Sequence, residues 1–458
     1  MDKNEKYIQL GKEPITKLLF QYALPSIIAM TAASLYNIID SIFIGQGVGA
    51  LAISGLAVTF PFMNLTAAFG AMIGAGASTL VSIKLGEKDY KTAQNILGNT
   101  LVLNLFFGAI TMILCLLFID PILFFFGASE NTIEYARSYM QVLLAGNIIT
   151  HVYFGLNALL RASGYPSKAM LATIITVVLD CILDAIFIFV LDWGIRGAAL
   201  ATVLAQSTSL IWLLYILSDS KKLLHFKKGI YTLKKRIIKE ILYIGLSPFF
   251  MNVAACLIVI VINNALKDAG GDLAIGAYGI INRIIFLILM VVMGLNQGMQ
   301  PIAGYNYGAR QYHRLNQVLT TTIVIASIVS TLGFIIGELF PGTIVSLFTT
   351  DKELVALATE GMKIYVIGFP LVGFQVVVSN FFQSIGQAHK SILLSLSRQV
   401  FILLPCLFIL PHFYGVAGVW YSMPIADISS SLLSAALLFW QFRAFKKMGN
   451  LQAAEVNS

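Results

Sequence analysis

Charge is scarce in this chain, and its scarcity excludes most classes of soluble protein. Only 11% of the 458 residues are charged, whereas 58% are hydrophobic. A water-soluble globule of this length needs more polar surface than this composition provides. The net charge of +8 is dispersed among short connections rather than gathered on one domain, so we expect no nucleic acid partner. The sequence predicts a protein surrounded by membrane lipid.

Residues that carry enzyme chemistry are equally sparse. The four cysteines lie far apart and no two have C-x-x-C spacing, which favours ordinary packing over disulfide or metal chemistry. The five histidines are scattered, and the G-x-x-x-x-G-K-[ST] motif of an ATP-binding loop is absent from the sequence. We therefore expect neither an enzyme nor an ATP-driven pump, and no cofactor. A transporter with this sequence would draw its energy from a gradient of H⁺ or Na⁺.

Apolar stretches long enough to cross a bilayer recur along the whole chain. A hydrocarbon core of about 30 Å requires about 20 helical residues. Twelve such stretches are separated by glycine, proline and charged residues, near 17–44, 52–83, 93–119, 133–160, 169–191, 195–218, 240–266, 274–306, 316–340, 358–383, 391–410 and 415–441. The predicted fold class is all-α integral membrane, with twelve transmembrane helices.

The distribution of basic residues predicts the orientation of these helices. With a cytoplasmic N-terminus, most of the 30 Lys and Arg residues fall in cytoplasmic segments. This bias places both termini in the cytoplasm. The one long basic connection, from Ser218 to Glu240, is expected to lie on the inner membrane surface. We expect a multi-pass protein of the bacterial cytoplasmic (inner) membrane.

An internal repeat divides the chain into two similar halves. A constant shift of 222 positions sets 51–55 onto 273–277 and Gly86 onto Gly308. Such a constant offset indicates two homologous bundles of six helices, which enter the membrane from the same side because six is even. We expect a monomer made of an N-terminal six-helix lobe at 1–218, a basic cytoplasmic inter-lobe linker at 219–239 and a C-terminal six-helix lobe at 240–458.

Three carboxylates deep in the first half suggest a cation site. An ionised carboxylate near the bilayer centre costs about 3 kcal/mol, so it is protonated, paired or bound to a cation. Asp180 and Asp184 share one helix face, and two like charges in a poor dielectric favour proton binding. If Asp40 faces them, the same oxygens can instead act as metal ligands for Na⁺. The Asn157 amide and the Thr202 hydroxyl would then complete the oxygen shell.

A structural alternative remains open for each of these residues. Asp40 would then cap a helix that breaks near 45–47, and Asp184 would bond a hydroxyl of a neighbouring helix. Asp180 could simply support Asp184. Asn157 and Thr202 could make the hydrogen bonds that are common between transmembrane helices.

Other intramembrane polar residues favour structural roles. Arg283, Arg398 and Asp427 fall in the eighth, eleventh and twelfth predicted spans, where an Arg–Asp pair would cancel two charges. His151 has no second metal ligand near it in the sequence and is expected to be a hydrogen-bonded core histidine.

Several motifs together resemble the multidrug and toxic compound extrusion (MATE) family over nearly the whole chain. They are Pro25 with 36–40 and 44–45, then 86–89, 160–164, 194–199, 300–301 and 306–309. The pattern is most similar to the DinF-like or MepA-like bacterial branch. This resemblance implies that Asp40, Asp180 and Asp184 bind the coupling cation. The seventh and tenth spans contain no carboxylate, so we expect no cation site in the second half.

The resulting prediction is a secondary active multidrug efflux transporter that exports organic cations by antiport with H⁺ or Na⁺. Flexible methionines and aromatic rings beside carboxylates suit small lipophilic or cationic substrates. Candidate residues on the substrate path are Tyr36, Met63, Phe154, Met290 and Met293. The alternative is a flippase of lipid-linked saccharides or another amphipathic lipid. A flippase should line its cleft with Arg or Lys, whereas the deep charges of the first half are acidic.

Overall fold

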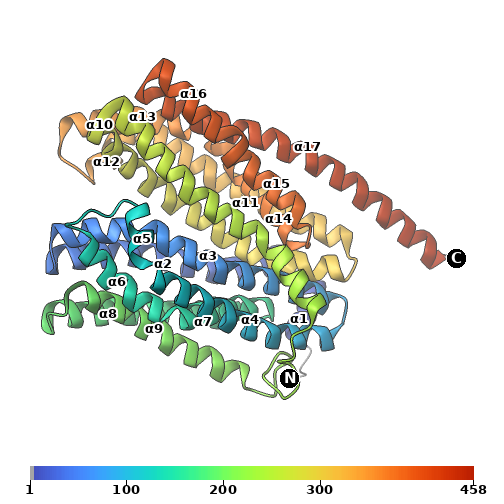
Figure 1. Ribbon diagram of the computed structural model, residues 1–458. Helices are drawn as coiled ribbons and strands as arrows, with labels where there is room; N and C mark the ends of the chain where they lie inside the picture. The colour runs from blue at the N-terminus through green and yellow to red at the C-terminus, as the bar shows by residue number, and fades with distance from the viewer. Residues whose placement is uncertain (1–4, 458) are drawn as a thin grey trace.

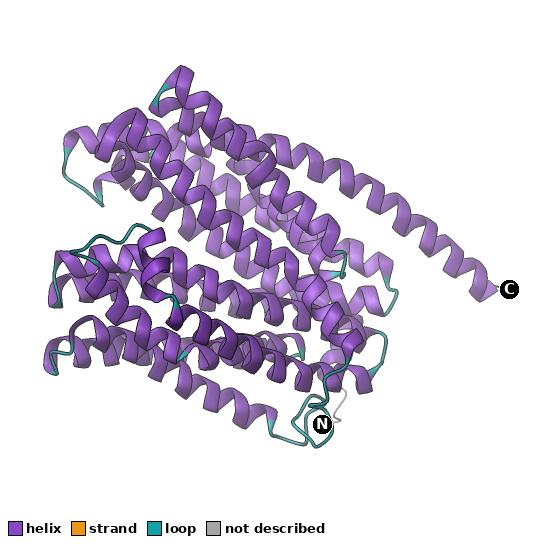
Figure 2. Ribbon diagram, in the orientation of Figure 1, coloured by secondary structure: helices purple, strands orange, loops and turns teal. Residues whose placement is uncertain are grey.

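The computed structural model describes residues 5–457, which form helices joined by short connections, with no strand among them (Figures 1 and 2). The first half contains α1 (Glu5–Lys12), α2 (Ile15–Gly47), α3 (Ala50–Gly86), α4 (Tyr90–Leu117), α5 (Ile119–Phe125), α6 (Ile133–Ala145), α7 (Asn147–Ala162), α8 (Pro166–Ala185) and α9 (Gly194–Leu217). A π-helical turn, Ile186–Val190, continues α8.

The second half repeats this plan. It contains α10 (Lys235–Gly308), α11 (Tyr312–Leu339), α12 (Pro341–Ser346), α13 (Lys352–Val366), α14 (Phe369–Ser384), α15 (Ala388–Leu396), a π-helical turn (Ser397–Leu403), α16 (Leu404–Tyr414) and α17 (Val416–Asn457). The long α10 is interrupted at Gly271, where a φ of 66° leaves the helical region. It therefore supplies two candidate spans, Lys235–Gly271 and Leu273–Gly308.

Ten candidate spans among the described residues are long and apolar enough to cross a membrane, and two bent helix pairs raise the number to twelve. In the first pair α6 and α7 meet at 56°, and in the second α13 and α14 meet at 54°. Gly146 separates the first pair and Gly368 lies at the second bend. The predicted all-α class with twelve transmembrane helices in two lobes is confirmed. The bend at Gly146 was not predicted, whereas the bend at Gly368 lies next to Pro370, where a proline interrupts the apolar stretch.

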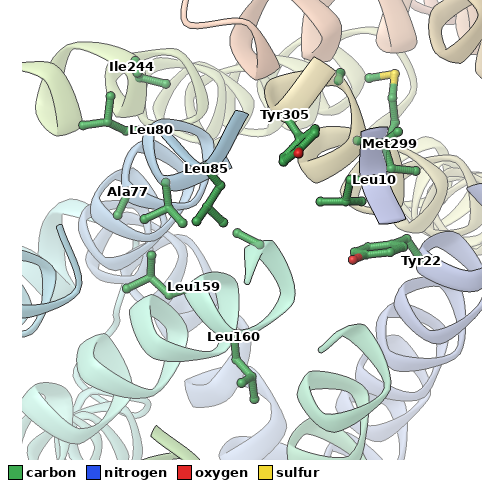
Figure 3. Close-up of a cluster of buried hydrophobic side chains, with 14 of the residues drawn as sticks. Leu10, Tyr22, Ala77, Leu80, Leu85, Leu159, Leu160, Ile244, Met299 and Tyr305 are labelled. Carbon is green, nitrogen blue, oxygen red and sulfur yellow. The ribbon is translucent and has the colours of Figure 1, made fainter. Parts of the chain in front are cut away.

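The hydrophobic core shows how the lobes meet. The largest buried cluster takes residues from both halves, including Leu10, Tyr22, Leu80, Met299 and Tyr305 (Figure 3). A second cluster is drawn from the second half alone, and a third from the first half alone. The lobes therefore share one core at one end of the bundle and have separate cores toward the other.

The shared core lies at the end of the bundle that carries the connection between α9 and α10. Leu224 and Ile230 of that connection are buried in it. We call this end of the bundle the linker end. Helix α1 and the last turns of α17 also lie on this side (Figure 1).

Two glycines allow α3 and α10 to touch at the linker end. A Cβ on Gly86 would lie 2.0 Å from the carbonyl oxygen of Tyr305, and one on Gly308 would lie 2.1 Å from that of Ile83. These two glycines are the pair that the 222-residue repeat aligns. Because backbone atoms oppose both positions, the contact leaves no room for a side chain.

We expect Gly308→Ala to destabilise the packed linker end by about 1–3 kcal/mol, the typical cost of overpacking a close contact. The thermal midpoint of the purified protein should fall. Gly342→Ala is the matched control, since a Cβ there would meet only the Thr359 hydroxyl at 3.7 Å. Equal midpoints for the two variants would contradict the close contact.

Candidate functional site

Asp40, Asp180 and Asp184 are brought together inside the first half. Asp40 lies on α2 and the other two lie one turn apart on α8, and these helices pack against each other. The three side chains are 5%, 0% and 0% exposed. All three interact electrostatically, and the carboxyl groups of Asp40 and Asp184 lie within reach of a shared proton.

The carboxylate cluster, meaning these three aspartates, is short of hydrogen-bond donors. Within residues 5–457, both carboxyl oxygens of Asp180 and of Asp184 lack a partner, as does one oxygen of Asp40. The Thr202 hydroxyl lies beside Asp180 but donates to the Ala198 carbonyl oxygen at 3.3 Å. Buried ionised carboxylates without donors are costly, so this arrangement favours binding of protons or of a small cation.

Two tyrosines border the carboxylate cluster. Tyr36 lies one turn before Asp40, beside Thr202 and Asp180. It is also a candidate residue of the substrate path, and its place beside the carboxylates leaves that prediction open. Tyr139 of α6 is 1% exposed and lies beside Asp40. Sequence reasoning missed Tyr139, although 133, 136, 140 and 144 form the buried stripe of α6 around it.

The structure does not bring Asn157 to the carboxylates. Its amide nitrogen donates to the carbonyl oxygen of Ala169 at 2.9 Å. Ala169 precedes Asp180 by about 16 Å along α8, given a rise of about 1.5 Å per residue. The tight turn between α7 and α8 pairs Asn157 with the start of α8, and this corrects the expectation that it completes a cation shell.

The three aspartates do not form a ready-made metal cage. In the part of the chain that the structure describes, no three His, Cys, Asp or Glu side chains converge closely enough to hold a metal ion. The predicted set of Na⁺ ligands, Asp40, Asp180 and Asp184, stays a prediction, in which hydroxyl or carbonyl oxygens would have to complete the oxygen shell. A proton shared between carboxyl groups needs only two of them.

The remaining substrate-path candidates are dispersed. Met63 packs against the hydrophobic cluster that is drawn from the first half alone, and its sulfur accepts a hydrogen bond from the Thr59 hydroxyl at 3.8 Å. Phe154 is 40% exposed on α7, next to the Tyr153 ring. Met290 and Met293 are half-buried one turn apart on α10. The five candidates thus do not gather into one cluster.

The other intramembrane residues take structural positions. Arg398 Nε donates to Asp427 Oδ1 at 2.6 Å, and Asp427 is 1% exposed. This is the predicted Arg–Asp pair, while Arg283 is exposed outside it. His151 is fully buried, with Nε2 3.1 Å from the carbonyl oxygen of Thr66, as predicted for a core histidine.

Comparison with known proteins gives the class of this molecule. The MatE family model matches residues 25–186 and 244–409, so the chain belongs to the MatE family of multidrug and toxic compound extrusion transporters. The predicted resemblance is confirmed, and so is the interpretation as a transporter rather than an enzyme.

Relatives and solved structures extend the match over almost the full length. The multidrug export protein MepA of Staphylococcus haemolyticus strain JCSC1435 is 28% identical over 440 residues, covering 95% of this chain and 96% of its own. The MATE multidrug transporter DinF-BH, solved in complex with rhodamine 6G, is 36% identical with a TM-score of 0.89, covering 95% and 98%. An outward-facing multidrug resistance MATE transporter reaches a TM-score of 0.91 at 26% identity, covering 96% and 99%.

Proposed function

We propose that this chain exports lipophilic organic cations across the bacterial cytoplasmic membrane in exchange for H⁺ or Na⁺. The observation that carries the proposal is the carboxylate cluster, in which five of the six carboxyl oxygens are buried without a hydrogen-bond donor in the described chain. The names of the relatives support the choice of substrate, because MepA is a multidrug export protein and DinF-BH was solved with rhodamine 6G.

Coupling follows from electrostatics. A cationic substrate and a coupling cation that stabilise the same negative charge compete, because the second to arrive gains less once the first has cancelled that charge. Binding of H⁺ to the carboxylate cluster therefore weakens binding of the substrate. Of the two coupling ions we propose H⁺, because a proton can be held between two carboxyl groups whereas Na⁺ needs a fuller shell of oxygen ligands.

The division of the hydrophobic core suggests how the transporter could open alternately to the two sides of the membrane. The lobes, proposed as 1–218 and 240–458 with the linker at 219–239, share a core at the linker end and part toward the other. We assign the linker end and both termini to the cytoplasm, which makes this conformation closed on the inside.

The π-helical turn Ile186–Val190, which begins two residues after Asp184, supplies a place where α8 can repack when the carboxylates gain a proton. A single chain contains both lobes, so we propose a functional monomer.

The decisive experiment is efflux of a fluorescent organic cation, rhodamine 6G, from proteoliposomes. One set of vesicles has an imposed pH gradient and a second has an imposed Na⁺ gradient. We expect export driven by the pH gradient. Export driven by the Na⁺ gradient alone would identify Na⁺, not H⁺, as the coupling ion. The proposal would be overturned if neither gradient drove transport of the dye.

Tyr139→Phe tests how the carboxylate cluster is held. The variant keeps the ring packed on α6 and removes the hydroxyl beside Asp40. Loss of one hydrogen-bonding group is worth about 1 kcal/mol, so we expect efflux to slow about fivefold. Tyr135→Phe, on the same helix, is the control. Equal rates in the two variants would remove Tyr139 from the site.

A further inference from the structure

The connection between α9 and α10 is ordered and bound to the first half by asparagine and glutamine side chains of α4. Asn99 donates to the carbonyl oxygens of Ile230 at 3.3 Å and Thr232 at 3.0 Å, and accepts from the backbone N–H of Lys234 at 2.8 Å. Gln94 donates to the carbonyl oxygen of His225. The segment therefore presents one defined surface rather than a loose tether.

The exposed side chains of this segment include both cations and apolar groups. We call five of them the linker face, namely Lys227, Lys228, Tyr231, Leu233 and Lys234. Tyr231 is 42% exposed and Leu233 is 47% exposed, although Ile230 beside them is buried. The three lysines are exposed as well. Exposure of an aromatic and an aliphatic side chain between lysines leaves apolar surface in contact with water, which is unfavourable in an ordered segment.

The charges of the linker face are not cancelled by the protein. Among the described residues, no acidic group lies within 4.0 Å of the three lysines. The acids next to the face are already engaged, because Asp219 pairs with Lys222 and Glu240 pairs with Arg236. The three lysines are therefore available to pair with an anion from outside the chain.

We propose that the linker face binds the headgroups of anionic phospholipids in the membrane leaflet beside the linker end. Phosphate groups lie between the lysines, while Tyr231 and Leu233 enter the interfacial layer. Basic segments next to a transmembrane helix attract anionic lipid, and tyrosine is favoured at the level of the headgroups. Orientation of the chain during insertion needs only the charges. A lipid site also needs the apolar pair and the clamp made by Asn99.

The test is native mass spectrometry of the full-length protein in detergent. Dioleoyl phosphatidylglycerol or dioleoyl phosphatidylcholine is added at equal concentration, and bound lipids are counted. We expect the wild-type protein to retain phosphatidylglycerol preferentially. Lys228→Gln/Lys234→Gln should reduce that preference at least about threefold. Lys352→Gln/Lys363→Gln, with the same loss of charge on exposed residues of α13, should leave it unchanged.

Two further variants keep every charge. Tyr231→Ser/Leu233→Ser removes the apolar pair, and Asn99→Ala releases the segment from α4. Both should weaken the preference for phosphatidylglycerol, provided that size-exclusion profiles match the wild-type protein. The proposal is overturned if Lys228→Gln/Lys234→Gln keeps the wild-type preference, or if the control pair on α13 loses as much.

Discussion

Asp184→Asn and Asp40→Asn should each abolish gradient-driven efflux while leaving the protein folded in the membrane. Each substitution keeps the shape of the side chain and removes the group that can gain or lose a proton. Asp40 and Asp184 lie within reach of a shared proton, so loss of either one breaks the pair. Asp180→Asn should act more mildly. Efflux of rhodamine 6G from proteoliposomes under a pH gradient measures the effect, and we expect a loss of at least about 100-fold.

Asp192→Asn is the matched control for these variants. Asp192 is an exposed acid of the same half, and its φ of 57° suits asparagine as well as aspartate. It should transport at the wild-type rate. Full, ion-dependent transport by a purified Asp40→Asn/Asp184→Asn double variant would refute the mechanism and return both residues to structural roles.

Local sequence pattern was sufficient for much of the fold. Long apolar stretches predict transmembrane helices because the bilayer requires them, and the ten long spans follow that rule. The bends are different, since α6 and α7 together look like one apolar stretch. Gly146 lies between them, where Val203 of α9 would crowd a Cβ at 2.5 Å. That close approach depends on a neighbouring helix, which a local pattern does not reveal.

For the candidate site too, local sequence predicted some features, whereas others depend on the packing between helices. The spacing of Asp180 and Asp184 alone places them on one helix face, and both are buried. That Asp40 faces them depends on the packing of α2 against α8, which only the family resemblance suggested. Asn157 was misplaced because its distance from Asp180 follows from the turn between α7 and α8. A buried tyrosine such as Tyr139 looks like ordinary core until the carboxylate opposite it is known.

Loss of one partner of the Arg398–Asp427 pair should be strongly destabilising. Asp427 is 1% exposed and the side chain of Arg398 is 24% exposed, so both charges are largely removed from water. Breaking a buried pair by removing one partner costs about 3–5 kcal/mol, because the other charge is left without compensation. The guanidinium stays charged, whereas a carboxyl group can become neutral by taking up a proton. Removal of the aspartate should therefore be the more damaging change.

We expect Asp427→Ala to lower the thermal midpoint and the membrane abundance more than Arg398→Met, and the double variant to recover part of the loss. The chain supplies its own control. Arg137 and Asp120 make the same Nε–Oδ1 contact at 2.6 Å, but their side chains are 38% and 42% exposed. Asp120→Ala should cost no more than about 1 kcal/mol, since water screens an exposed pair. Normal abundance of Asp427→Ala with loss of ion dependence would instead move the coupling site into the second half.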